Sequence, residues 1–135
     1  MKRYLFDTNA LGRFINRRPA FVEKVREVRR TGAHLGTCIP AVGELLYGLE
    51  MSSSREENLD RAMRAFAQLR IWPYSWEAAA EFGRVRAGLD RIGRRMQFID
   101  IQIAAIARML GSCIVVSSDS DLAAIPGLTV ENWAA

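Results

Sequence analysis

Short, uniformly apolar segments alternate with segments of helical periodicity along this 135-residue chain. Residues 3–6, 34–39, 71–74 and 113–116 are predicted strands, and residues 128–130 are a candidate fifth. Continuous apolar strands are typical of parallel sheets, because helices cover both faces of such a sheet. The pattern therefore predicts an α/β fold: one domain over residues 1–135, with a parallel sheet of four or five strands flanked by helices on both faces.

The segments between these strands carry helix start and stop signals. Apolar residues recur at helical spacing, Ser or Asp precedes several of the segments, and Gly follows others. A proline in the first turn and a Ser-x-x-Glu capping box are further start signals. The predicted helices are residues 19–30 before Gly32, Pro40 to Glu50, a helix opened by the capping box of residues 54–57, one capped by Ser75, and one from Asp100 to Gly111.

The composition excludes several classes of protein. Half of the residues are apolar, yet no apolar run approaches the ~20 residues that a membrane helix needs. The start, MKRYLFD, lacks the apolar stretch of a secretion signal, so we expect a cytoplasmic protein with no membrane contact. Cys38 and Cys113 lie far apart in apolar segments without a CxxC pair, which predicts two reduced core thiols.

Arginine carries most of the positive charge. The formal net charge is +4, and Lys2 and Lys24 are the only lysines. Because the planar guanidinium group suits phosphate, this surface favours nucleic-acid partners, although a basic face can also simply be solvated. The candidate nucleic-acid contacts lie in two clusters, with Arg13, Arg17 and Arg18 in one and Arg91, Arg94 and Arg95 in the other.

Four acidic residues lie at strand ends or in apolar helices, where an unpaired carboxylate would be costly to bury. Asp7 follows the first strand, Asp119 follows the fourth, and Glu44 interrupts an apolar helix. Asp100 stands at the head of the most hydrophobic helix. Each could be an isolated helix cap or a solvated residue, but ligands of parallel sheets bind beyond the carboxyl ends of the strands. The set of four therefore predicts one shared pocket.

Such a pocket requires a positive charge at its centre. Carboxylates a few ångströms apart repel by about 1 kcal/mol per pair in water, and by more when partly buried. Mg²⁺ or Mn²⁺ fits an all-oxygen ligand set, and a basic protein with an acidic metal pocket suits phosphodiester substrates. His34 is the only histidine, which excludes a two-histidine ribonuclease, and no GxxxxGK phosphate-binding loop is present.

Four blocks of the chain resemble a known family. They read DTN, PAVGELLYG, FIDIQIAAIA and VVSSDSDLAAIPGLTVENW, in that order and across nearly the whole length. Together they are similar to the PIN domain family and, more narrowly, to the VapC-type toxins of toxin–antitoxin pairs. The resemblance implies a Mg²⁺- or Mn²⁺-dependent endoribonuclease that hydrolyses RNA with an activated water. It also implies a homodimer, or a larger toxin–antitoxin assembly, inhibited by a VapB-type antitoxin.

The resemblance also implies roles for individual residues. Asp7, Glu44 and Asp100 match the three firmest acids of the family's metal site, Asp119 matches the more variable fourth, and Thr8 matches a supporting hydroxyl. The family often has Thr before the fourth acid, or Asn in its place, whereas this chain reads Ser-Ser-Asp. The fourth acid therefore stays open between Asp119 and Asp121, with Asp119 favoured because it comes sooner after the strand. The other supporting candidates are Asn9 and Ser118.

Two rival functions remain. A receiver-type phosphoacceptor domain also has an acidic Mg²⁺ pocket, but it needs a lysine after a late strand, and both lysines of this chain are early. A PIN-like domain that binds RNA or a partner without cleavage is the other alternative. An RNA cleavage assay separates that alternative from an enzyme.

Overall fold

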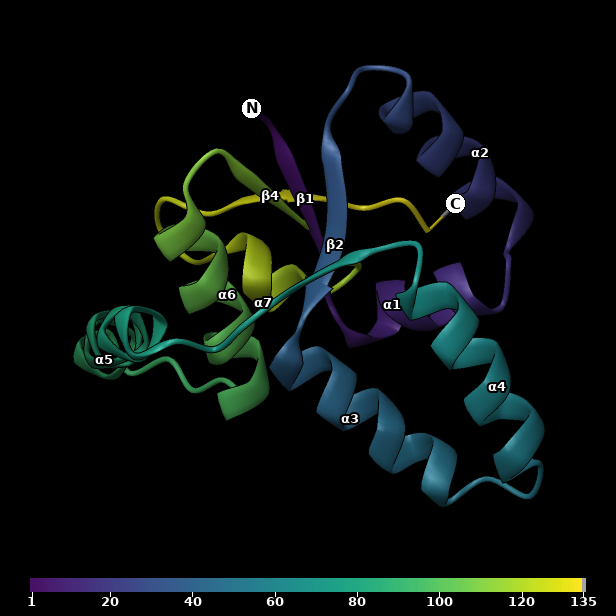
Figure 1. The fold of residues 1–135 in the computed structure, drawn as a ribbon. Helices are drawn as coiled ribbons and strands as arrows, with labels where there is room; N and C mark the ends of the chain where they lie inside the picture. The colour runs from purple at the N-terminus through teal and green to yellow at the C-terminus, as the bar shows by residue number, and fades with distance from the viewer. Residues whose placement is uncertain (135) are drawn as a thin grey trace.

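A five-stranded parallel sheet forms the centre of the molecule (Figure 1). The computed structural model describes residues 1–134. Its strands are β1 (Arg3–Phe6), β2 (His34–Cys38), β3 (Arg70–Trp72), β4 (Cys113–Val116) and β5 (Thr129–Glu131), in the order β3-β2-β1-β4-β5. All four neighbouring pairs are parallel, and β1 lies in the middle. The predicted α/β class is confirmed, with the candidate fifth strand present.

Seven helices connect and cover the strands within residues 1–134. Their bounds are α1 (Thr8–Ile15), α2 (Pro19–Arg29), α3 (Ile39–Glu50), α4 (Arg55–Phe66), α5 (Trp76–Arg91), α6 (Phe98–Leu110) and α7 (Ser120–Ala123). Helices α1, α2 and α4 contribute to the hydrophobic cluster on one face of the sheet, and α5, α6 and α7 to the cluster on the other. Helix α3 continues from β2 beyond the carboxyl end of the sheet (Figure 1).

The central strand supplies both hydrophobic clusters. Side chains alternate along a strand, so Tyr4 and Phe6 face one layer while Leu5 faces the other. The fully buried ring of Phe6 lies 5.2 Å from the ring of Phe21 and 5.7 Å from the ring of Trp133, measured between centroids. These contacts fix the end of β1, and therefore the start of α1, relative to α2 and the C-terminal segment.

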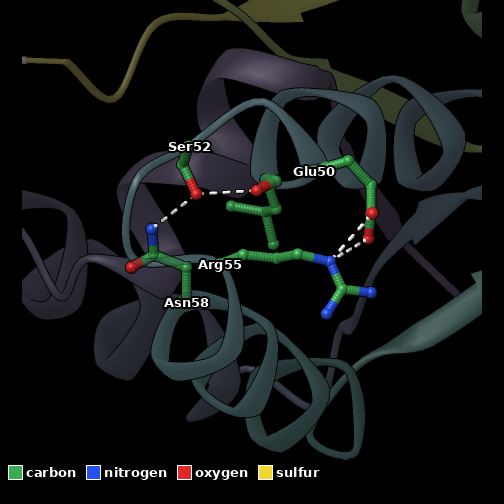
Figure 2. A network of polar contacts seen from close by, with 5 residues as sticks. Glu50, Ser52, Arg55 and Asn58 are labelled. Carbon is green, nitrogen blue, oxygen red and sulfur yellow. Dashed lines mark hydrogen bonds and ion pairs between the residues drawn. The ribbon is translucent and has the colours of Figure 1, made fainter.

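The predicted capping box before α4 is wrong. Ser54 precedes the helix, but its backbone angles (φ −110°, ψ 47°) are not extended and its side chain makes no capping hydrogen bond. The connection from α3 to α4 is held by other residues (Figure 2). Arg55 Nε pairs with Glu50 Oε1 at 2.8 Å, and Asn58 Nδ2 donates to Ser52 Oγ at 3.1 Å. Whether Ser54 can cap α4 depends on the backbone geometry of this turn, which a local sequence pattern does not specify.

Two other helix starts have different outcomes. Ser75 caps α5 as predicted, because its Oγ accepts a hydrogen bond from Ala78 N at 3.2 Å. Asp100 does not precede its helix: α6 begins at Phe98, Gln97 takes the N-cap position, and Asp100 lies in the first turn. The carboxylate of Asp100 is therefore not needed as a cap.

The structure bears on two expectations from composition, which concern membrane helices and the cysteines. No helix within residues 1–134 combines the length and the apolar character that a membrane crossing requires. Both cysteines are free thiols, as predicted, with Cys38 buried and Cys113 partly exposed.

Candidate active site

A cleft of about 730 Å³ opens at the carboxyl edge of the sheet. It receives side chains from the ends of β1 and β4 and from α3 and α6, which are far apart in the sequence. All of the acids singled out from the sequence line it: Asp7, Glu44, Asp100, Asp119 and Asp121. The arrangement follows from the parallel sheet, because the ends of β1 and β4 lie side by side in register, with Phe6 opposite Val116.

Asp7 is both a helix cap and a wall of the cleft. Its Oδ1 accepts a hydrogen bond from Ala10 N at 2.9 Å, and its own N–H donates to Val116 O at 3.1 Å. The residue is only 5 % exposed, and this burial is the main cause that raises the pKa of its carboxyl. Hydrogen bonds from Ser117 and Ala10 lower that pKa, while the charges of Asp119 and Glu44 raise it. The Asp7 carboxylate is thus rigidly held among other negative charges.

The carboxyl pKa of Asp100 is the most strongly shifted among the acids of the cleft. Burial, followed by the negative charges of Asp119, Asp7, Glu44 and Asp121, raises the pKa of its carboxyl to about 6. Coulomb repulsion falls with distance and with solvent screening. The effect of these four carboxylates on the pKa of Asp100 therefore means that they lie close to it around the same cleft. A cation in the cleft would favour the ionised form of Asp100 and lower this pKa.

The structure distinguishes the two candidates for the fourth acid. Asp119 is half-buried and fixed at both ends: its N–H donates to Ser117 Oγ at 2.9 Å, and its Oδ1 accepts from Asp121 N at 2.9 Å. The side chain of Asp121 is 54 % exposed and pairs with Arg94 Nη2 at 3.2 Å. Asp119 is therefore the better-held acid, and the charge of Asp121 is already partly compensated.

The cleft fits a hydrated divalent cation better than a fully chelated one. Within residues 1–134, no group of three or more His, Cys, Asp or Glu side chains is arranged to hold a metal ion as it stands. The donor set is nevertheless all oxygen, and Mg²⁺ keeps several waters and needs only one or two carboxylates. The buried Oγ1 of Thr8, which lines the same cleft, has no hydrogen-bond partner among the described residues. Such a hydroxyl suits a water of a bound ion or of the substrate.

The structure also locates the predicted supporting residues. Thr8 and Asn9 line the cleft, but Ser118 does not; it is exposed and lies beside Ala10 and Trp133. The serine beside Asp7 is Ser117, which is 3 % exposed and whose side-chain hydrogen bond lowers the pKa of Asp7. Sequence reasoning did not select it, because only the register of two distant strands distinguishes Ser117 from Ser118. Because Phe6 pairs with Val116, Ser117 stands beside Asp7 at the neighbouring strand end.

The predicted nucleic-acid contacts are dispersed. Arg95 lines the acidic cleft, together with Met96 and Gln97, which the sequence alone did not single out. Arg13 lines an adjoining groove, and Arg94 is paired with Asp121. Arg17 lies in a separate groove that shares no residue with the cleft and also contains Arg26, Arg29, Arg61 and Arg64.

Comparison with known proteins agrees with this fold. The sequence model of the PIN domain matches residues 4–128, so the chain belongs to the PIN domain family. Within that family its relatives are VapC proteins. The Ribonuclease VapC2 of Haemophilus influenzae is 32 % identical over 98 % of this chain and 99 % of its own length. The tRNA(fMet)-specific endonuclease VapC of Shigella flexneri is 34 % identical with the same two coverages.

A solved structure shows the same architecture. The DNA-bound VapBC of Salmonella typhimurium contains a chain with 29 % sequence identity to this one and a TM-score of 0.86. The match covers 98 % of this chain and 99 % of that chain. The sheet order and the helical layers described above are therefore those of a VapC-type PIN domain.

Proposed function

We propose that this chain is an endoribonuclease toxin of a VapBC-type pair, which hydrolyses RNA phosphodiester bonds with Mg²⁺ or Mn²⁺. The observation that carries the proposal is the convergence of Asp7, Glu44, Asp100 and Asp119 on one cleft of a protein with net charge +4. Acids from four separate elements repel one another unless a cation lies between them. The relatives named as ribonuclease and endonuclease support the same activity.

Each residue of the cleft has a proposed task. Asp7, Glu44, Asp100 and Asp119 would hold the cation directly or through water. When bound, the ion supplies an activated water and positive charge for the leaving oxygen. Asp7 contributes a fixed position, because Ala10 and Ser117 hold its carboxylate.

The neutral and basic side chains of the cleft act on the substrate. Thr8 and Asn9 line the cleft and orient its carboxylates or a phosphate of the RNA. Arg95 provides a guanidinium group that can bind a phosphate of the RNA through two parallel hydrogen bonds. Acids around a cation, together with an arginine in the same cleft, suit a substrate that is itself negatively charged.

The proposed partners follow from the same family. A VapB-type antitoxin would bind and inhibit the chain, since the Salmonella typhimurium relative was solved as a VapBC complex. A homodimer, or a larger toxin–antitoxin assembly, is also part of the proposal. Helix α3 exposes the apolar side chains of Ile39 and Tyr47, and Met51 is exposed just beyond its end, which provides surface for such contacts.

Metal removal tests the activity directly. We expect cleavage of a fluorogenic RNA in Mg²⁺ or Mn²⁺, and a fall to the level of the enzyme-free control when EDTA is added. Re-addition of Mn²⁺ should restore the rate. Cleavage that persists in EDTA would contradict the metal requirement, while RNA binding without cleavage in either metal would support the non-catalytic alternative. The tRNA(fMet) named for the Shigella flexneri relative is the first structured substrate to test.

The fourth acid can be assigned with two matched variants. Asp119→Asn should reduce RNA cleavage by about 10- to 100-fold, the usual loss for a group that orients a metal site. Asn also caps helices, so the fold of the Asp119 segment should survive. Asp121→Asn removes an exposed pair with Arg94, worth at most about 1 kcal/mol, and the weakest of the charges that act on Asp100, so it should change the rate by less than about fivefold. A larger loss in Asp121→Asn than in Asp119→Asn would reverse the assignment.

A further inference from the structure

A second groove adjoins the acidic cleft and has the opposite charge. We propose that this groove holds the RNA strand on one side of the bond that is cut, so that it determines how a long substrate is positioned. The inference rests on the proposed nuclease function. It assigns binding roles to Arg13 and Arg18, which were nucleic-acid candidates from the sequence, and to Gly12 and Gly48, which were not.

The groove is continuous with the cleft. It has a volume of about 720 Å³ between α1 and α3, which pack against each other. Thr8, Asn9 and Glu44 line both cavities, so a chain that leaves the acidic cleft at this edge enters the groove directly. The arginine-rich groove that contains Arg17 shares no residue with either cavity and offers no such continuity.

The charge of the groove suits a phosphate backbone. Arg13 and Arg18 line it, and neither guanidinium group takes part in an ion pair within residues 1–134. Glu44, at the shared edge, is the one acid among the lining residues. The acids thus gather where a cation would bind, and the unpaired arginines gather beside them, where the adjacent phosphates of a bound strand would lie.

Two glycines keep the groove open. Gly12 of α1 and Gly48 of α3 line it, and a Cβ atom added at either would meet no atom within 4 Å. Neither glycine has a positive φ, so neither backbone conformation requires glycine. Glycine in a helix nevertheless costs about 1 kcal/mol relative to alanine. At Gly12 and Gly48 an occupant of the groove would meet helix backbone and no side chain.

The test fills the groove without touching the acids. Gly12→Leu and Gly48→Leu add a Cβ that meets no atom within 4 Å, and they should not lower the stability of the helices, because leucine is a better helix former. For an RNA of many nucleotides we expect KM to rise about tenfold with kcat nearly unchanged. For a dinucleotide, too short to occupy the groove, both constants should remain at the wild-type values. Gly83→Leu, in an equally open position of α5 outside the described cavities, is the matched control.

A salt titration gives an independent measurement. Arg13→Ala with Arg18→Ala should reduce the slope of log KM against log salt by about one for each RNA phosphate that an arginine no longer neutralises. Arg30→Ala, which removes an exposed arginine after the far end of α2, should leave that slope unchanged. Weaker binding in the glycine variants together with a reduced slope in the arginine variant would support the groove as a strand site.

Several outcomes would overturn the inference. Wild-type KM for long RNA in both glycine variants would do so, as would equal effects on the long RNA and the dinucleotide. Unchanged KM combined with weaker inhibition by an antitoxin would assign the groove to a protein partner instead. If the wild-type chain cleaves no RNA, the proposed function fails separately. Fluorescence anisotropy with labelled single-stranded RNA then still tests the groove, because the same variants must lower binding.

Discussion

Asp7→Asn is expected to reduce RNA cleavage by about 10²–10³-fold while the protein stays folded. Decreases of this size follow the removal of one preorganised electrostatic group from an active site. Asp7 is such a group, since burial and the hydrogen bonds to Ala10 and Ser117 hold its carboxylate in the acidic cleft. Asn keeps an oxygen that can accept from Ala10 N and is itself a favourable N-cap, so α1 should still form.

The measurement compares initial cleavage rates in Mg²⁺ with thermal unfolding followed by circular dichroism. Asp60→Asn, the same chemical change at an exposed position of α4, is the matched control and should cleave RNA at the wild-type rate. Wild-type cleavage by Asp7→Asn, after identical purification and exclusion of contaminating nuclease, would remove the basis of the proposed mechanism. A large drop in unfolding temperature would show that Asp7 serves the fold instead.

The sheet could be predicted because its strands are short and apolar on both faces. Tyr4, Leu5 and Phe6 are all buried, since consecutive side chains of β1 face two different hydrophobic layers. A pattern of this kind reports burial on both sides and therefore a parallel sheet between helices. The location of Asp7 at the carboxyl edge then follows from the strand direction alone.

Features that depend on tertiary geometry could not be predicted in the same way. Ser54 has the sequence of a capping residue, but the turn after α3 leaves its backbone outside the extended region that a cap requires. Ser117 and Ser118 are chemically identical, and only the pairing of β4 with β1 decides which of them contacts Asp7. Local sequence specifies a residue's chemistry, whereas the register of two distant strands specifies its neighbours.

Local sequence also does not specify where the long arginine side chains lie. Arg94 and Arg95 are adjacent in the sequence, yet one pairs with Asp121 and the other lines the acidic cleft. Arg17 and Arg18 are also adjacent, and they line different grooves. A positive φ of 52° at Arg17 lies in the tight connection between α1 and α2, where successive side chains diverge. A count of charges predicts a basic surface, but the direction of each charge depends on such turns.

Asp100→Asn is expected to inactivate the enzyme by a similar factor and yet to stabilise the metal-free protein at pH 8. Burial and four neighbouring carboxylates raise the pKa of Asp100 to about 6, so its ionised form is unfavourable in the folded state. Asn removes that charge, and no cap is removed with it because Gln97 holds the N-cap position of α6. Since the carboxyl is partly exposed and screened, we expect a gain of about 1 kcal/mol, measurable as a rise of a few degrees in Tm.

The pH dependence of this gain identifies its cause. A carboxyl whose pKa is higher in the folded than in the unfolded chain binds more protons when folded, so its stabilising contribution is lost as pH rises. For Asp100 the window extends from about 3.8, its ordinary value, to about 6. The advantage of Asp100→Asn in EDTA should therefore be absent near pH 4, grow through pH 6 and remain constant above. Mg²⁺ should raise the Tm of the wild type more than that of the variant, because the ion compensates the carboxylate. A Tm of Asp100→Asn equal to or below that of the wild type at pH 8 in EDTA would contradict the repulsive acidic cleft itself.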